Sequence, residues 1–226
     1  MKYPMVGLML FLTTASVWAG TFRDDFEDGN LDGWRQDFPF AQEPTLWKIV
    51  DGKLECTRFS NISTVLITGD ATWKDYTIEY DVTLLEDHGP GDVDVVLRWR
   101  GAAGYLAIYI GDFGGLPAIY VERNLNIIMQ KPFDPLELNK WHHLKVEAKG
   151  KNFTFWVNDE KVLEHQDNTI KEGAVGLGLA NYTARFDNVE ISGPDVPDVT
   201  PPTWKARPVQ PSDKLAKTWA TIKQGR

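Results

Sequence analysis

The sequence predicts an all-β fold, a two-sheet antiparallel jelly-roll sandwich, and three observations lead to it. Nearly every segment between Thr21 and Ser192 alternates apolar with polar residues, which is the period of a half-buried strand. Turn residues such as Asp51-Gly52 separate these short runs. No convincing amphipathic helix precedes residue 210. A dozen or so short strands at this spacing predict two packed sheets.

Most of the predicted strands lie in the middle of the chain and are rich in β-branched and aromatic residues. In chain order they are residues 77–85, 92–99, 105–110, 118–122, 142–148, 153–157, 161–165 and 175–179. The first reads TIEYDVTLL and the second DVDVVLRW, so each places every second residue on one face. Two further strands are expected at the ends of the domain, near DDFEDGNLDGW (24–34) and FDNVEIS (186–192).

The first 19 residues have the features of a secretory signal peptide. A charged start at Lys2 precedes an apolar stretch over 6–12, and residues 17–19 (VWA) form a small-residue cleavage site before Gly20. The apolar run is too short to span a bilayer, and no other segment approaches that length. We therefore expect a secreted protein, extracellular or periplasmic, with no transmembrane segment after cleavage. An uncleaved N-terminal anchor is the alternative.

Charge and cysteine content narrow the class of protein further. Cleavage would remove Lys2 and leave 23 of the 24 basic residues against 32 acidic ones, a net charge of −9. Such an acidic body argues against nucleic-acid binding, which needs clustered lysine and arginine. Cys56 is the only cysteine, so no internal disulfide can form. Stability is therefore expected from the buried core, helped by a metal if one binds.

The composition changes at residue 194. Six prolines lie between residues 194 and 211, and we expect them to prevent strand pairing. Beyond them, Ser212 caps a predicted short helix that carries Trp219. This tail is either a loosely packed terminus or a segment that docks to another protein. The predicted organisation is a signal peptide at 1–19, a jelly-roll domain at 21–193, and a Pro-rich linker with a short basic amphipathic tail at 194–226.

Carboxylates and amides gather at the two ends of the domain. If the strands near 24–34 and 186–192 pair, these oxygens would meet around a hard cation such as calcium. Residues 28–33 (DGNLDG) match the opening half of an EF-hand loop, but the acid expected near the end of such a loop is replaced by Pro39. A true EF-hand is therefore excluded, and we interpret Asn30 and Asp32 as turn residues.

Four segments carry a resemblance to a known family: DDFEDGNLDGW, WKIVDGKLE, WHHLKVEAKGKNFTFWVNDEKVLEH and GAVGLGLANYTARFDNVEI. Together they resemble a laminin-G-like, concanavalin A-like jelly roll, similar to secreted bacterial 3-keto-disaccharide hydrolase-type domains. The resemblance spans Thr21 to Gly193 and rests on structural motifs, so it implies the fold more than an activity. In such sandwiches a structural calcium joins the first and last strands, which implies Asp25 and Asp187 as its side-chain ligands.

Catalytic signatures are sparse. Laminarinase-type glycosidases of this fold carry Glu-x-Asp-x-x-Glu on one strand, which places their acids at separations that suit a retaining mechanism. Glu79-Tyr80-Asp81 begins such a motif, but the third carboxylate comes only at Glu86, too late for the spacing. The sequence therefore argues against that type of glycosidase.

The division of side chains between sheet faces points to a binding surface. If Val93, Val95, Leu97 and Trp99 face the core, the alternate residues of three neighbouring strands face outward together. These outward residues are Asp94, Arg98, Arg100, Tyr105, Tyr109, Tyr120 and Glu122. Tyrosines stack on sugar rings, and arginines and carboxylates bind hydroxyls, so we expect a carbohydrate-binding groove on the concave sheet. A solvated face with ordinary cross-strand pairs is the alternative.

Three functions fit these observations. The first is a secreted, calcium-stabilised module that binds a polysaccharide or glycoconjugate without chemistry of its own. The second is a glycan-cleaving hydrolase resembling the 3-keto-disaccharide hydrolases, with Glu122 or Asp94 as acid or base and Arg98 orienting the substrate. The third is a protein–protein adhesion module. Paired carboxylates with a raised pKa would favour the enzyme, an aromatic platform would favour binding, and a flat apolar patch would favour adhesion.

Overall fold

The fold is all-β, as predicted, in the computed structural model of the chain, which describes residues 19–37, 46–101, 103–112 and 116–205. These residues form strands and no helix. None of the described residues therefore belongs to a helix long and apolar enough to cross a membrane. Residues 1–18 of the predicted signal peptide and 206–226 of the predicted tail lie outside the described residues.

The strands are β1 (Gly20–Asp24), β2 (Trp34–Asp37), β3 (Trp47–Val50), β4 (Lys53–Thr57), β5 (Thr64–Thr68), β6 (Tyr76–Trp99), β7 (Leu106–Gly111), β8 (Ala118–Arg123), β9 (Asn126–Pro132), β10 (Trp141–Lys149), β11 (Asn152–Val157), β12 (Glu160–Gln166) and β13 (Ala174–Gly193).

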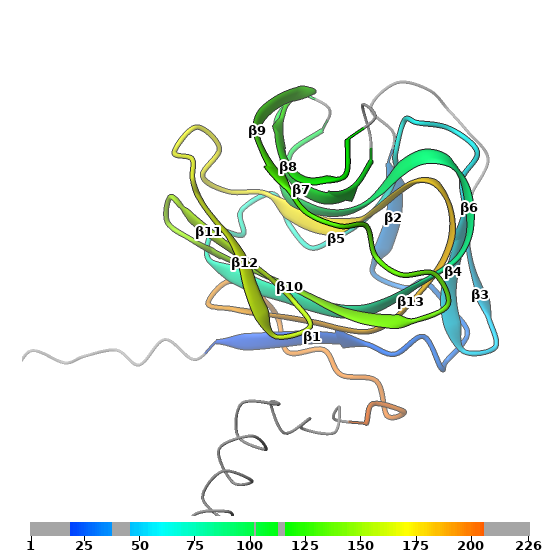
Figure 1. The fold of residues 1–226 in the computed structure, drawn as a ribbon. Helices are drawn as coiled ribbons and strands as arrows, with labels where there is room; N and C mark the ends of the chain where they lie inside the picture. The colour runs from blue at the N-terminus through cyan, green and yellow to red at the C-terminus, as the bar shows by residue number, and fades with distance from the viewer. Residues whose placement is uncertain (1–18, 38–45, 102, 113–115, 206–226) are drawn as a thin grey trace, which may run out of the picture.

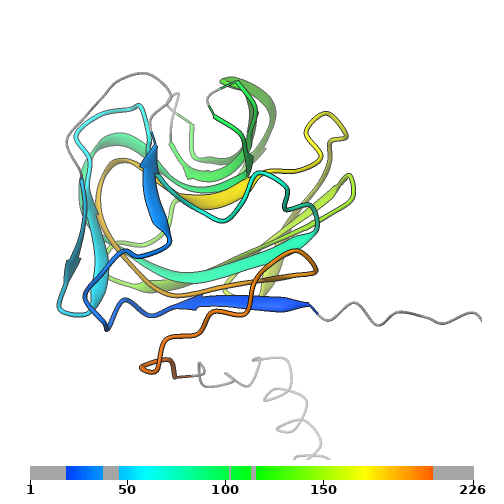
Figure 2. The same cartoon turned by 180° about the vertical axis from the view of Figure 1, so that it is seen from behind.

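Two layers of antiparallel strands pack face to face (Figure 1 and Figure 2). Layer A contains β12, β11, β10, the first half of β6, the second half of β13, and then β4 and β3, with β1 also beside β13. Layer B contains β9, β8, β7, the second half of β6, the first half of β13, β5 and β2. The prediction of a two-sheet antiparallel sandwich is therefore confirmed.

β6 and β13 belong to both layers because each bends about halfway along its length (Figure 1). They pair with each other along most of this length, and their register shifts near Ala180 and Thr183, where they bend. Gly91 lies beside this bend. A β-carbon on Gly91 would lie 2.2 Å from the carbonyl oxygen of Ala180, so only glycine fits between the two backbones here.

The main core fills the space between the layers. From layer A, β6 contributes Ile78, Tyr80 and Val82, and from layer B, β13 contributes Leu177 and Leu179. These side chains are inaccessible to water and follow the period of two expected of a strand with one buried face. A second buried cluster lies on the other face of layer B. Its members are Val65, Ile67, Val96, Trp99, Tyr105, Ala107, Tyr109, Ala118, Tyr120 and Ala174.

The first and last strands lie side by side, as the sequence predicted. β1 pairs with the end of β13, from Gly20 opposite Gly193 to Asp24 opposite Val189. The chain then returns along β1, where the amide of Val199 donates to the carbonyl of Thr21. We call this junction of β1, β13 and the returning chain the seam.

The chain continues to contact the jelly roll after residue 193, where the last strand ends. Val199 also accepts a hydrogen bond from the amide of Arg23, although prolines were expected to prevent strand pairing after residue 194. Pairing is possible because Pro197 and Pro201 flank the bonded residue and do not occupy its position. The described part of the predicted tail therefore packs on the jelly roll.

Candidate functional site

A cavity of about 210 Å³ lies on the face of layer B that points away from the main core. β6 contributes most to it because its alternate residues Asp92, Asp94 and Val96 share that face. Strands β5, β7 and β8, the loop at 61–63 and the start of β9 supply the rest. The lining residues that the structure describes are Asn61, Ile62, Ser63, Val65, Asp92, Asp94, Val96, Trp99, Tyr105, Ala107, Tyr109, Glu122, Leu125 and Ile127.

Asp92 and Asp94 form a buried acid pair in this cavity. The hydroxyl of Ser63 donates to Asp92 Oδ1 over 3.1 Å. Burial raises the pKa of Asp92 well above its ordinary value, and the negative charge of Asp94 raises it further. Burial also raises the pKa of Asp94, to about 6, although hydrogen bonds from Asp92 and Ser63 oppose this rise. Burial and the mutual repulsion of the two carboxylates therefore both favour a protonated form of this pair.

Asp94 has space for its carboxyl group because it lies opposite a glycine of β13. Gly178 is its neighbour across the strands, and a β-carbon there would lie 2.4 Å from Asp94 Oδ2. The other oxygen, Asp94 Oδ1, is buried and has no hydrogen-bond partner among the described residues. A buried carboxylate oxygen without a donor costs free energy, which a bound ligand with a donor would recover.

Glu122 and Tyr105 form a second polar pair on the cavity wall. The Tyr105 hydroxyl donates a short hydrogen bond to Glu122 and accepts one from the amide of Leu125 over 3.2 Å. Burial raises the pKa of Tyr105, and the negative charge of Glu122 raises it further. The Tyr105 hydroxyl therefore stays protonated and holds the Glu122 carboxylate in place.

Aromatic rings line the cavity beside these acids. The rings of Trp99 and Tyr105 lie 5.0 Å apart between centroids, and the Trp99 indole N–H donates to Asp37 over 2.8 Å. Tyr109 stacks on Tyr120 with centroids 5.0 Å apart and ring planes at 19°. Tight packing fixes these rings in orientation, which suits them to contact a ligand with little loss of side-chain entropy.

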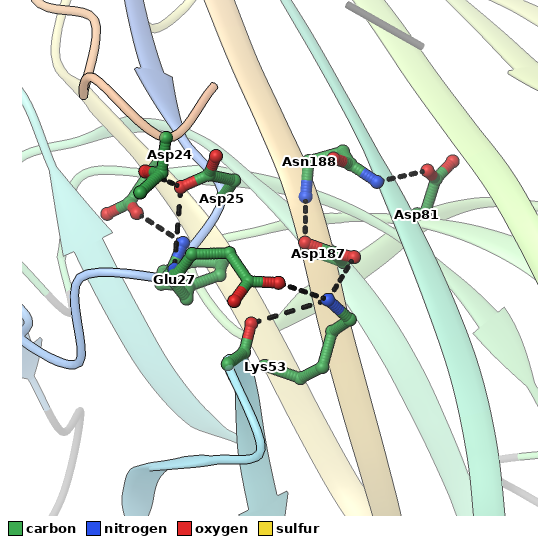
Figure 3. A network of polar contacts seen from close by, with 10 residues as sticks. Asp24, Asp25, Glu27, Lys53, Asp81, Asp187 and Asn188 are labelled. Atoms are coloured by element: carbon green, nitrogen blue, oxygen red, sulfur yellow. Dashed lines mark hydrogen bonds and ion pairs between the residues drawn. The ribbon is translucent and has the colours of Figure 1, made fainter. Parts of the chain in front are cut away.

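The oxygens expected to bind calcium lie at the seam, where protein groups hold them (Figure 3). The Lys53 ammonium lies 2.9 Å from Asp187 and 3.3 Å from Glu27, and the Thr203 hydroxyl donates to Asp25 over 2.8 Å. In the part of the chain that the structure describes, no three His, Cys, Asp or Glu side chains gather to hold a metal. Asp25 and Asp187 therefore do not fit a calcium site in this arrangement, since a lysine supplies the cation beside Asp187.

With the fold and the cavity established, comparison with known proteins places the chain in a family. Residues 21–192 match the family described as a 3-keto-alpha-glucoside-1,2-lyase-like domain. This chain belongs to that family. The resemblance inferred from the sequence motifs is therefore confirmed.

Relatives of the family domain include levanase from Bacillus subtilis (strain 168), with 29% identity over 157 residues. The match covers 67% of this chain but 23% of levanase, so the chain spans less than a quarter of that relative. Among solved structures, carbohydrate-binding module CBM66 from Bacillus subtilis has a TM-score of 0.56 at 23% identity, over 71% of this chain and 96% of the other.

Two further structures confirm the concanavalin-like jelly roll predicted for the family domain. Lectin II from Ulex europaeus has a TM-score of 0.56 at 10% identity, and the beta-glucanase of Bacillus licheniformis 0.55 at 10%. Each match covers 76% of this chain and 97% of the other. At these identities the likeness concerns the fold alone.

Four of the seven residues that the sequence predicted to bind sugar line the cavity together: Asp94, Tyr105, Tyr109 and Glu122. Arg98 does not, and its prediction was wrong. Its φ of 51° breaks the alternation of β6, so that Arg98 turns away from the cavity and Trp99 takes the outward position. The Arg98 guanidinium instead donates to the carbonyls of Lys74, Gly150 and Ile170 at 2.6–3.1 Å.

Arg100 and Tyr120 also lie apart from the cavity wall. Arg100 follows the end of β6, is exposed, and lies 3.6 Å from Glu172, so its predicted place in the groove was wrong. Tyr120 is buried against Tyr109, and its hydroxyl donates to the carbonyl of Leu116 over 2.5 Å. Tyr120 therefore supports the Tyr109 ring by stacking against its face.

The sequence interpretation missed four polar or aromatic lining residues: Asn61, Ser63, Asp92 and Trp99. Asp92 could have been found, because it lies two residues before Asp94 on the same strand and shares its face. Trp99 could not, since strict alternation places it in the core. Ser63 precedes β5, and nothing in the sequence places that loop beside Asp92.

Proposed function

We propose that this domain binds a sugar residue in the cavity of layer B, through its carboxyl groups and aromatic rings. The observation that carries the proposal is the meeting of Asp94, Tyr109 and Glu122 in one cavity, from three adjacent strands. Carboxylates accept hydrogen bonds from sugar hydroxyls, and aromatic rings pack on the apolar face of a sugar. The cavity is smaller than the roughly 300–1,000 Å³ of drug-sized ligand pockets. It therefore suits one residue of a polysaccharide or glycoconjugate.

The names of the relatives support a sugar as the ligand. They include a carbohydrate-binding module, a lectin and a beta-glucanase, and the family description refers to an alpha-glucoside. Export through the predicted signal peptide would bring the domain to extracellular or periplasmic glycans. Calcium has no part in this proposal, because Asp25 and Asp187 do not fit it.

Exposed apolar residues surround the mouth of the cavity. Ile62, Leu125 and Ile127 line it and are 46–48% exposed. They form a rim around a hollow, which favours a ligand that enters the hollow over adhesion to another protein through a flat patch. These three rim residues would contact the part of the polysaccharide or glycoconjugate that is joined to the bound sugar residue.

A second function, cleavage of a glycoside, is favoured by the acid pair. Burial raises the pKa of Asp94 to about 6, and burial and the charge of Asp94 raise the pKa of the neighbouring Asp92 well above its ordinary value, so that Asp92 is the better proton donor. In a 3-keto-α-glucoside, Asp94 would remove the proton on C2, next to the ketone. The C–H electrons would form a C1–C2 double bond while the C1–O bond breaks, and Asp92 would protonate the leaving oxygen. Arg98, once expected to orient the substrate, is buried elsewhere and takes no part.

Binding is tested by applying the protein that begins at Gly20 to a glycan array, with Asp94→Asn as the site variant. Asp159→Asn, on an exposed turn, is the matched control. We expect glycan signals for the unmodified protein and the control, and a loss of about tenfold or more for Asp94→Asn, as for loss of a charge-assisted hydrogen bond. No signal on any glycan would overturn the binding proposal.

Cleavage is tested by incubating the same three proteins with 3-keto-glucosides and following the enone absorbance and the released alcohol. Turnover by the unmodified protein and the control, but not by Asp94→Asn, would support the enzyme. Sugar binding without turnover would leave binding as the function.

A further inference from the structure

The cavity contains three carboxyl groups and no cation among its described lining residues. Asp92, Asp94 and Glu122 line it, and no lysine, arginine or histidine does. Arg98 and Arg100, which the sequence had placed on this face, point elsewhere. A ligand with a carboxylate, phosphate or sulfate group would therefore meet acidic side chains and no positively charged one among the described lining residues, in a place where burial reduces screening by solvent.

The hydrogen bonds of these acids leave one acceptor unused. Ser63 donates to Asp92 and Tyr105 donates to Glu122, whereas Asp94 Oδ1 has no partner in the described chain although Asp94 is only 4% exposed. An ammonium group brings three N–H donors and a positive charge, so it forms stronger bonds to a carboxylate than a hydroxyl does.

The aromatic lining adds a second attraction for a cation. Trp99, Tyr105 and Tyr109 line the same cavity as the acids. The faces of such rings attract ammonium groups, and more strongly where water is excluded. Carboxylates and aromatic rings together therefore favour an amine over a hydroxyl at the same position on a sugar.

We propose that the cavity selects a sugar that carries a free amino group and excludes acidic sugars. This inference rests on the proposed sugar-binding function and names its ligand class. Asp94 Oδ1 and Glu122 accept the N–H groups of the ammonium, and the aromatic rings pack against the sugar ring. Neutral sugars lose the charge attraction, and acidic sugars are repelled.

The test compares sugars that differ at one substituent. Glucosamine, galactosamine and mannosamine are compared with glucose, galactose and mannose, with their N-acetyl derivatives, and with glucuronate and galacturonate. Binding is followed by saturation-transfer NMR and by tryptophan fluorescence, since Trp99 lines the cavity. A buffer near pH 6.5 keeps the sugar amine charged, because amines of this kind lose their proton at about pH 7.7.

Two glutamate variants distinguish the effect of a negative charge inside the cavity from the effect of the net negative charge of the whole protein. Glu122→Gln removes one charge from the cavity and keeps an acceptor for Tyr105. Glu147→Gln removes one charge from an exposed position on β10. We expect at least one amino sugar to bind about tenfold tighter than its parent and its N-acetyl form, and Glu122→Gln, but not Glu147→Gln, to reduce this preference several-fold.

The outcomes divide clearly. Equal binding of amino and parent sugars, an unchanged preference in Glu122→Gln, or tighter binding of a uronate would overturn the ligand class while leaving the sugar-binding function in place. If no sugar of any class binds here or on the glycan array, the proposed function fails together with this inference.

Discussion

The guanidinium of Arg98 lies over the ring of Phe153, 4.8 Å from its centroid, although the sequence pattern places Arg98 on an outer face. Its side chain is 1% exposed, and its N–H groups bond to backbone carbonyls from three separate turns. These turns precede β6, join β10 to β11, and follow β12. Arg98 thus joins three turns to the end of β6, and its departure from alternation brings Trp99 into the cavity.

Replacing Arg98 by methionine should destabilise the protein strongly. The variant would leave the carbonyl of Ile170 buried without its donor, remove the bonds to Lys74 and Gly150, and lose the packing of the guanidinium on Phe153, so we expect the free energy of unfolding to fall by about 3 kcal/mol or more. Arg100→Met, at an exposed position two residues away, should change it by less than about 0.5 kcal/mol. Urea unfolding measures both values. Similar stabilities for the two variants would show that the Arg98 contacts do not hold the turns.

The strands could be predicted because successive side chains alternate between the two faces of most strands, and the sequence pattern shows this alternation. Residues 92–97 show this well, since Val93, Val95 and Leu97 face the core and Asp94 faces the cavity, as expected. The bend that lets β6 and β13 serve both layers was not predicted. It depends on close approach of two backbones at Gly91, which alternation alone does not reveal.

The candidate site could be predicted only as far as alternation holds. Asp94, Tyr105, Tyr109 and Glu122 were found because regular strands carry them, whereas Arg98 has a positive φ that no local pattern signals. The seam shows a different limit. The pairing of the first and last strands was predicted, but a long-range contact from Lys53 supplies the positive charge beside Asp187.

Asp94→Asn should change how stability varies with pH. Burial raises the pKa of Asp94 from 3.8 to about 6, so the folded protein keeps this proton to a higher pH than the unfolded chain. The stabilising contribution of this group is therefore complete below about pH 3.8 and is lost as the pH rises through about 6.

The unmodified protein should accordingly lose stability relative to Asp94→Asn across that window. Urea unfolding at a series of pH values measures this difference, with Asp159→Asn as the exposed control. A constant difference between the unmodified protein and Asp94→Asn across the window would show that Asp94 titrates at its ordinary pKa in the folded state.

Removal of divalent cations should leave the stability of the seam unchanged. The Lys53 ammonium lies within ion-pair distance of Asp187 and Glu27, so no metal is needed beside Asp187. We expect the melting temperature to be the same with excess chelator and with excess calcium, and Lys53→Gln to lower stability by about 1 kcal/mol, because this ion pair is partly exposed. A melting temperature that falls by several degrees on chelation would restore the calcium site.

Gly178→Ala should weaken ligand binding by displacing Asp94. The new β-carbon would lie 2.4 Å from Asp94 Oδ2 and 2.7 Å from its β-carbon, so rotation of the carboxyl group alone cannot relieve the clash. The backbones of β6 and β13 would have to separate, or Asp94 would have to move out of the cavity. We expect a loss of about 1–3 kcal/mol in stability, as for other overpacked sites.

The double variant Gly178→Ala with Asp94→Gly removes the colliding side chain and should recover most of the stability lost by Gly178→Ala, measured by urea unfolding. It should not recover sugar binding, because the carboxyl group is absent. Recovery of stability without binding would show that Gly178 is needed to accommodate the Asp94 side chain. If Gly178→Ala kept full affinity for the ligand, the position of the Asp94 carboxyl group would not matter for binding, and the sugar contacts proposed for it would be wrong.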